Sequence, residues 1–134
     1  MKKLLLVLVI VAGAGLAWTY KMKSDAGYSL AELNDIASGA NKSLPAMVDA
    51  ATRLDRVIAH EGVLEKQYTL VASRLPEIDT AGFETQMSAA LIAESCANKQ
   101  SRTLYKAGVS EWFSYQDMNG QPVATVKIGQ ENCS

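Results

Sequence analysis

The hydrophobic positions along this chain follow three patterns, and each pattern predicts a different kind of element. Residues 4 to 20 include no charged side chain. Residues 29 to 40 and 80 to 97 repeat their hydrophobic side chains at the spacing of an α-helix. Residues 52 to 72 and 109 to 128 alternate in the way that is typical of β-strands. We therefore expect an apolar segment followed by a helix, a hairpin, a helix and a hairpin.

Helix boundaries are marked by residues that satisfy the free backbone groups of a helix end. Ser29 and Glu32 have the spacing of a capping box, which predicts that the first helix begins there. Asn41 follows Gly39 and suggests its end. The second helix is expected to be capped by Asp79 or Thr80 and to run to about residue 97, with further helical turns over residues 102 to 106.

Each predicted hairpin has its own turn. In the first hairpin, residues 60 to 62 form the turn, with Leu54 and Ile58 on one face and Val57 on the other. In the second, Asn119 and Gly120 join the two strands. Asn-Gly between β-rich runs is a strong hairpin signal, and we expect both residues to have positive φ angles.

These elements predict an α+β fold. An antiparallel sheet of about four strands would pack on the central helix over residues 80 to 97. The expected divisions are an N-terminal signal-anchor helix over residues 1 to 23, a linker with an amphipathic helix over 24 to 51, and a disulfide-bridged α+β domain over 52 to 134.

The apolar segment admits two interpretations. Lys2 and Lys3 precede it, which favours a cytoplasmic N-terminus and export of the rest of the chain. Trp18 and Tyr20 suit the far membrane interface of a retained single-pass inner-membrane anchor, which is the interpretation we prefer. The small residues 12 to 14 would instead suit cleavage and release into the periplasm. No cysteine stands directly after the segment, so we expect no lipoprotein processing there.

The charge distribution excludes nucleic acid as a partner. Four of the 13 basic residues flank the apolar segment, so residues 24 to 134 carry nine basic and 14 acidic residues. The resulting net charge of about −5 provides no basic surface for a phosphate backbone.

Cys96 and Cys133 are the two cysteines of the chain. Both lie in the part expected to be exported, where disulfides form and persist. A bridge between them would close a long loop and stabilise a small core. A redox or metal role has little support, because the chain has no C-x-x-C motif and one histidine. We expect no metal and no cofactor.

Catalytic chemistry also has little support. His60 is expected in an exposed turn, and no phosphate loop, zinc spacing or calcium loop occurs. Neighbouring carboxylates alternate with basic residues, which is typical of cross-strand pairs in a sheet. The sequence therefore predicts that the protein is not an enzyme.

The sequence offers three candidate protein contacts: Trp112, Arg53 and Arg56. Alternation places Trp112 on the opposite face of its strand from Phe113 and Tyr115. We expect the helix over residues 29 to 40 to cover Trp112, because its hydrophobic stripe must be buried somewhere. The alternative is that Trp112 is exposed on an open sheet face and binds a protein.

Several motifs occur in a particular order: LPAMVDAATRLDRV (44 to 57), YTLV (68 to 71), a cysteine, YQDMNGQPVATVKI (115 to 128) and a final cysteine. Over about residues 43 to 133, this series resembles a family of small exported or inner-membrane-anchored proteins of Gram-negative bacteria and their mobile elements. The resemblance implies an envelope compartment and a domain type, and it implies no reaction.

Three functions are consistent with these features. The first is a non-enzymatic protein-binding module on the periplasmic side of the inner membrane, with another envelope protein as its partner. The second is an exclusion or immunity factor that blocks a phage, a conjugative element or a toxin. The third is a small-ligand-binding domain or hydrolase, which would require a concave pocket beside His60.

Overall fold

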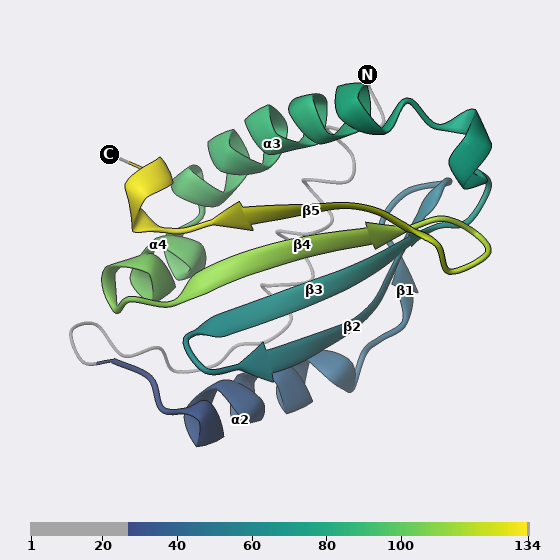
Figure 1. Cartoon of the computed structure of the whole chain (residues 1–134). Helices are drawn as coiled ribbons and strands as arrows, with labels where there is room; N and C mark the ends of the chain where they lie inside the picture. The colour runs from purple at the N-terminus through teal and green to yellow at the C-terminus, as the bar shows by residue number, and fades with distance from the viewer. Residues whose placement is uncertain (1–26, 134) are drawn as a thin grey trace.

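The computed structural model describes residues 27 to 133, which form an α+β fold with one five-stranded sheet (Figure 1). In chain order the elements are α2 (Leu30–Asn41), β1 (Ala46–Met47), β2 (Thr52–His60), β3 (Val63–Leu70), η1 (Leu75–Glu77), α3 (Thr80–Ala97), α4 (Lys99–Lys106), β4 (Ser110–Gln116), β5 (Pro122–Ile128) and η2 (Gln130–Asn132). The strands are ordered β1-β2-β3-β4-β5 across the sheet.

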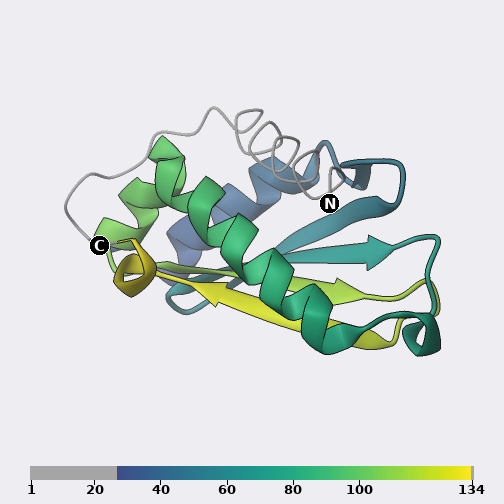
Figure 2. The same cartoon turned by 90° about the horizontal axis from the view of Figure 1, so that it is seen from above.

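The helices cover one face of this sheet, which we call the helix face (Figure 2). Helix α2 packs mainly on β2, and α3 packs mainly on β5. Alternate residues of the strands point toward the helices and join them in a single hydrophobic core. That core includes Leu33 and Ile36 of α2, Leu64 of β3, Leu91 of α3 and Phe113 of β4.

Most of the predicted elements are confirmed. Ser29 and Glu32 form the expected capping box, with the Ser29 side chain accepting from the Glu32 N–H and the Glu32 side chain accepting from the Ser29 N–H. Asp79 caps α3 by accepting from the N–H of Gly82. Helical turns continue after residue 97 as α4. The first hairpin turns at Gly62, which has a φ of 73°.

The prediction of a four-stranded antiparallel sheet is wrong in two respects. Strand β1 adds a fifth strand, and its two residues are too few to show an alternating pattern. Strands β3 and β4 are neighbours and run parallel. The connection through α3 and α4 returns the chain to the end at which β3 began, so β4 runs in the same direction as β3.

Two local predictions also need correction. Leu54 and Val57 were expected on opposite faces, but both are buried on the helix face. An irregularity in the β2–β3 register between Leu54 and Arg56 inserts one extra residue, so the alternation of inward and outward side chains shifts by one position. In the second hairpin, Gly120 has a φ of 82°, but Asn119 does not have a positive φ. The turn there spans five residues and is not a two-residue Asn-Gly turn.

The buried carboxylate of Asp117 organises this longer turn. It accepts from the N–H groups of Asn119 and Gln121, both at 2.8 Å, and from that of Leu75 at 2.7 Å. Burial alone would raise the pKa of Asp117, but these N–H donors outweigh burial and hold the pKa below its ordinary value. Asp117 thereby ties the β4–β5 turn to η1, the segment that leads into α3.

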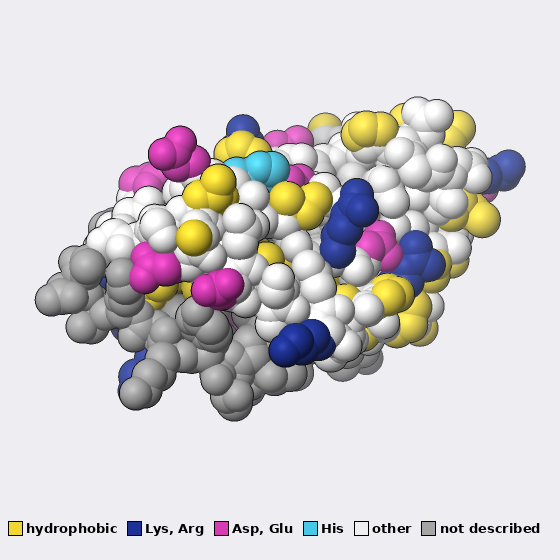
Figure 3. Space-filling view, turned by 90° about the horizontal axis from the view of Figure 1, so that it is seen from below, with side chains coloured by type: hydrophobic (Ala, Val, Ile, Leu, Met, Phe, Trp, Pro, Cys, Tyr) yellow, Lys and Arg dark blue, Asp and Glu magenta, His cyan; other side chains and the backbone are white. Residues whose placement is uncertain are grey.

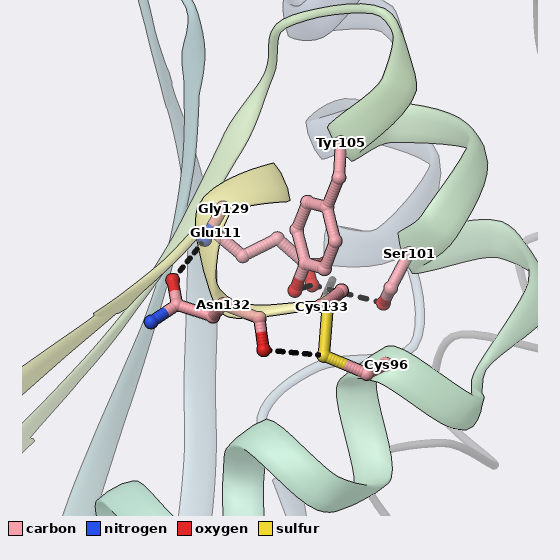
Figure 4. The surroundings of a disulfide bond; sticks show 7 residues. All are labelled: Cys96, Ser101, Tyr105, Glu111, Gly129, Asn132 and Cys133. Carbon is pink, nitrogen blue, oxygen red and sulfur yellow. Dashed lines mark hydrogen bonds between the residues drawn. A yellow bond between two sulfur atoms is a disulfide. The ribbon is translucent and has the colours of Figure 1, made fainter.

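The predicted disulfide between Cys96 and Cys133 is confirmed (Figure 4). It joins α3 to the residues after η2, over a sequence separation of 37 and a Cα–Cα distance of 5.3 Å. Beside it, Cys96 Sγ lies 3.4 Å from the Asn132 carbonyl oxygen, and the side chain of Asn132 accepts from the N–H of Gly129 at 2.8 Å. The C-terminal turn is therefore fixed to the end of the helical layer.

A buried ion pair lies in the same part of the core. Lys66 Nζ is 3.1 Å from Glu111 Oε2, and both side chains are almost fully buried. The hydroxyls of Tyr105 and Ser101 donate to Glu111 Oε1 at 2.6 and 2.9 Å (Figure 4). Burial alone would raise the pKa of Glu111, but the Lys66 charge and these hydroxyls hold it below its ordinary value. Glu111 is therefore ionised at neutral pH.

Between residues 27 and 133, no helix is long and apolar enough to cross a bilayer. The predicted signal-anchor helix over residues 1 to 23 lies outside the described residues. Its role as an anchor stays a prediction.

The buried pair predicts a non-additive response to substitution. Lys66→Met leaves the Glu111 charge uncompensated in the core, so we expect the free energy of unfolding to fall by about 3–5 kcal/mol. Adding Glu111→Gln removes that charge and keeps an acceptor for Tyr105 and Ser101, so the double variant should recover at least about 1 kcal/mol. Urea denaturation of both variants measures the coupling. Simple additivity would show that the pair is not electrostatically coupled.

Candidate functional site

The face of the sheet opposite the helices carries the three candidate contacts. We call it the open face and define it by the outward-pointing residues of β2 to β5: Arg53, Asp55, Arg56, Ile58, His60, Val63, Glu65, Gln67, Thr69, Ser110, Trp112, Ser114, Gln116, Pro122, Thr125 and Lys127. All the helices of the described chain that pack on the sheet contribute to the core on its other side. The open face is therefore a strand-built surface without a helical cover from residues 27 to 133.

Strand register arranges this surface in rows that cross the sheet. One row runs from Arg56 through Gln67 and Ser114 to Thr125. The next row on one side contains Glu65, Trp112 and Lys127, and the next on the other side contains Arg53, Thr69 and Gln116. Arg56 and Trp112 are two strands apart in adjacent rows, which corresponds to about 12 Å between their Cα atoms.

Hydrogen bonds hold the row of Arg53 in a fixed arrangement. The Arg53 guanidinium pairs with the carboxylate of Asp55. The other oxygen of Asp55 accepts from the Thr69 hydroxyl at 2.5 Å, and Thr69 accepts from the side-chain amide of Gln116 at 3.0 Å. These bonds connect three strands, so the polar side chains of this row are largely ordered before any partner binds.

Glu65 lies at the centre of a second network. It accepts from the Ser114 hydroxyl at 2.7 Å, and its other oxygen is 2.7 Å from His60 Nε2. Burial alone would raise the pKa of Glu65, but Ser114, His60 and Gln67 together hold it below its ordinary value. His60 thus has a carboxylate partner at the end of β2. It is a member of a surface network rather than an isolated turn residue.

Trp112 is partly exposed on the open face, and the expectation that the helix over residues 29 to 40 covers it is wrong. The sheet is wide enough for α2 and α3 to pack side by side on the helix face, so the stripe of α2 is buried there. The ring of Trp112 instead lies 5.6 Å from the His60 ring, with Lys127 Nζ 4.3 Å from its centroid. The second distance is typical of a cation–π contact.

Two basic groups of the open face have no carboxylate partner within residues 27 to 133. Arg56 donates through Nε to the side chain of Gln67 at 2.7 Å, which leaves the end of its guanidinium free of any acid there. Lys127 is exposed above Trp112. Figure 3 views the molecule from the edge at which β2 lies, and its hydrophobic side chains form scattered spots between charged ones.

Two adjoining hollows mark the open face around Arg56. One, of about 330 Å³, is lined by side chains that include Arg56, Glu65, Ser114 and Thr125. The other, of about 350 Å³, includes Arg53 and again Arg56. His60 lines neither of them, so the pocket that a hydrolase at His60 would require is not found at these hollows. Among the described residues, no group of His, Cys, Asp and Glu side chains could hold a metal ion.

Comparison with known proteins gives a fold but no family. No family model and no curated protein matches the chain. Three solved structures are similar. The first is a candidate secreted protein from Pseudomonas aeruginosa, with a TM-score of 0.66 and 18% sequence identity. The matched region covers 76% of this chain and 89% of the Pseudomonas chain. The pilotin EpsS of the Vibrio vulnificus type 2 secretion system has a TM-score of 0.62 at 12% identity, with coverages of 76% and 88%.

The third similar structure is the type II secretion system pilotin AspS from Vibrio cholerae. Its TM-score is 0.59 and its sequence identity is 21%. The matched region covers 75% of this chain and 88% of the AspS chain. Two of the three similar structures are therefore pilotins. At these identities the likeness establishes a shared fold, and the function of this chain has to be argued from its own surfaces.

Sequence reasoning proposed Trp112, Arg53 and Arg56 as contacts and missed the residues that bond to or pack against them. Gln67, Glu65 and Lys127 became part of the surface only when the strand register was known. The parallel pairing of β3 with β4 was the missing information, because it places Glu65 beside Trp112.

The Glu65 network predicts a measurable pKa change. Ser114→Ala removes the first hydrogen bond that stabilises the Glu65 carboxylate, so the pKa of Glu65 should rise toward its ordinary value of 4.5. The stabilisation that Glu65 contributes is present above that value and is lost as the pH falls through its lowered pKa. A carboxyl-carbon NMR titration measures the shift. Ser110→Ala, on the same face of β4, is the matched control, and an equal pKa in both variants would contradict the network.

Proposed function

We propose that this protein is a non-enzymatic protein-binding module of the bacterial envelope, and that its open face binds another envelope protein. The observation that carries this proposal is the open face itself. It spans four strands, has no helical cover from the described residues, and presents Trp112, Arg53 and Arg56 on one surface. Tryptophan and arginine are enriched among the residues that dominate protein–protein binding energy.

The order of the open face also favours binding. Side chains on neighbouring strands hydrogen-bond to one another, so a partner would meet groups that are already oriented. Less conformational entropy is then lost on association. Arg56 and Lys127 add positive charge without acidic partners among residues 27 to 133, which favours a partner surface that carries carboxylates.

The fold supports a role beside secretion machinery. Two similar structures are pilotins of type II secretion systems. Fold alone does not decide function, but the apolar N-terminal segment and the disulfide also fit an exported protein. We propose a pilotin-like accessory component of an envelope assembly. It would be held at the periplasmic side of the inner membrane by residues 1 to 23, and confinement to a membrane would raise the effective concentration of its partner.

Photocrosslinking from defined positions tests this proposal. A photoreactive phenylalanine derivative at Thr125, which is exposed on the open face, should crosslink one envelope protein in living cells. Arg56→Glu in the same chain should reduce that product by about tenfold, because it reverses a charge in the same row of the surface as Thr125. Mass spectrometry of the crosslinked product identifies the partner.

The controls use the other side of the molecule. Arg102 is exposed on α4, so the same photoreactive residue there should give no such product, and Arg102→Glu should leave the Thr125 product unchanged. Equal crosslinking from positions 125 and 102, or no product from position 125, would reject the open face as the binding surface. A partner from an invading element or a toxin would favour an exclusion or immunity role over an assembly role.

A further inference from the structure

The outer edge of β2, on the side away from β3, is covered by another strand only near its start. Strand β1 pairs with Arg53 and Leu54, so β2 from Asp55 to His60 has no neighbouring strand on that side. The backbone N–H and C=O groups of such an edge can pair with a strand of another molecule, and native proteins ordinarily block that pairing. This stretch of β2 therefore needs protection of another kind.

The side chain of Asn41, the last residue of α2, occupies the middle of this edge. Its Nδ2 donates to the Val57 carbonyl oxygen at 2.9 Å, and its Oδ1 accepts from the Val57 N–H at 2.8 Å. A residue of a neighbouring antiparallel strand would make the same two bonds, since hydrogen-bonded partners in such a pair exchange one bond in each direction. The amide of Asn41 therefore takes the place of a paired strand.

Both the residue type and its position suit this role. An asparagine side chain carries a donor and an acceptor on one planar group, whereas an ionised aspartate has acceptors only. Helix α2 lies along β2, so a side chain at the end of this helix can reach the strand (Figure 1). Asn41 is itself exposed, so a molecule that approaches this edge meets Asn41 before it meets Val57.

The residues on either side of Val57 offer little to a pairing strand. The irregularity between Leu54 and Arg56 interrupts the regular spacing of the backbone groups. On the other side, Ala59 is the next residue whose backbone groups point outward, because these groups alternate along a strand, and β2 ends at His60. A continuous ladder along this edge would therefore require the backbone groups of Val57.

The other edges of the sheet are protected differently. Strand β5 begins with Pro122, which has no N–H, and carries the exposed Lys127 near its end. Proline and lysine on an edge strand both disfavour pairing between sheets. Strand β1 has two residues, which is too few for a stable ladder. By comparison, the stretch around Val57 depends on one side chain.

We propose that Asn41 is an edge guard, which occupies the pairing groups of Val57 and thereby prevents β2 of a second copy of this chain from adding to the sheet. Strand β2 can pair with itself, because in an antiparallel pair centred on Val57 the two copies of this residue would exchange both bonds. In that register Arg56 of each copy would lie opposite Ile58 of the other, so no like charges would face each other directly.

This inference does not depend on the open face having a partner. A pair of sheets joined through β2 would bring a second copy close to Arg53 and Arg56, so the guard also keeps that part of the open face accessible. Loss of the crosslink from Thr125 with an intact guard would reject only the binding role. A failed guard with an intact crosslink would reject only the present proposal.

Amide hydrogen exchange of the full chain in detergent micelles tests the guard without a substitution. The Val57 N–H is bonded to Asn41, whereas no side chain or loop within residues 27 to 133 bonds to the N–H of Ala59 on the same edge. We expect the Val57 amide to exchange at least about tenfold more slowly than the Ala59 amide. Equal exchange of the two amides would overturn the proposal.

The variant Asn41→Ala tests what the guard prevents. It removes both bonds to Val57, so light scattering in detergent micelles should show the protein mass double as the concentration rises, while the unsubstituted chain stays monomeric. Asn98→Ala is the matched control, because it removes an asparagine that accepts from the Ser101 N–H at 2.9 Å and caps α4. It should lower the Tm and leave the chain monomeric.

A second substitution identifies the surface through which Asn41→Ala associates. Adding Ile58→Lys would place a positive charge opposite Arg56 of the other copy, so the double variant should return to a monomer. A monomeric Asn41→Ala chain at every concentration, equal association of the Asn98→Ala control, or a dimer unchanged by Ile58→Lys would overturn the proposal. If Asn41→Ala does not fold, the exchange comparison in the unsubstituted chain decides.

Discussion

The parallel pairing of β3 with β4 is the constraint on which both faces of this protein depend. It brings Tyr68 beside Tyr115 on the helix face, and it brings Glu65 beside Trp112 on the open face. The pairing exists because α3 and α4 return the chain to the end at which β3 began, and Cys96–Cys133 attaches the end of α3 to the C-terminal turn. A parallel neighbour requires such a crossover, since a tight turn can only reverse the chain.

Local patterns in the sequence predicted the elements well and their arrangement less well. The capping box at Ser29, the turn at Gly62 and the disulfide depend on residues close together or on a unique pairing, so they could be found from sequence. The parallel strand pair depends on where a long helical connection ends, and no local signal records that. The register irregularity after Leu54 likewise reverses the faces of β2 without a distinctive residue.

Charged residues in the core were the hardest to predict. Lys66 lies on the same face of β3 as Leu64 and Tyr68, but a basic residue in a strand is ordinarily assigned to the solvent. It is buried because Glu111 lies on the next strand, and Tyr105 and Ser101 supply the remaining hydrogen bonds from α4. Each of these residues looked ordinary in the sequence. Their importance comes from a tertiary arrangement that only the crossover creates.

The two faces of the sheet differ in what their side chains do. The helix face contains the core and the disulfide, so its residues are mostly fixed by packing. The open face has few hydrophobic constraints, yet its polar side chains are ordered by bonds across three strands. Such order without a helical cover is consistent with a surface that is retained for a partner.

Hydroxyl-radical footprinting in intact cells tests the central claim most directly. Trp112 on the open face and Leu30 on α2, which is 45% exposed, would be compared in cells and in the purified full chain. The account predicts that Trp112 is strongly protected from oxidation in cells, while Leu30 is modified equally in both states. Equal oxidation of Trp112 in both states, with no protection anywhere on the open face, would contradict the claim that this surface binds a partner in the envelope.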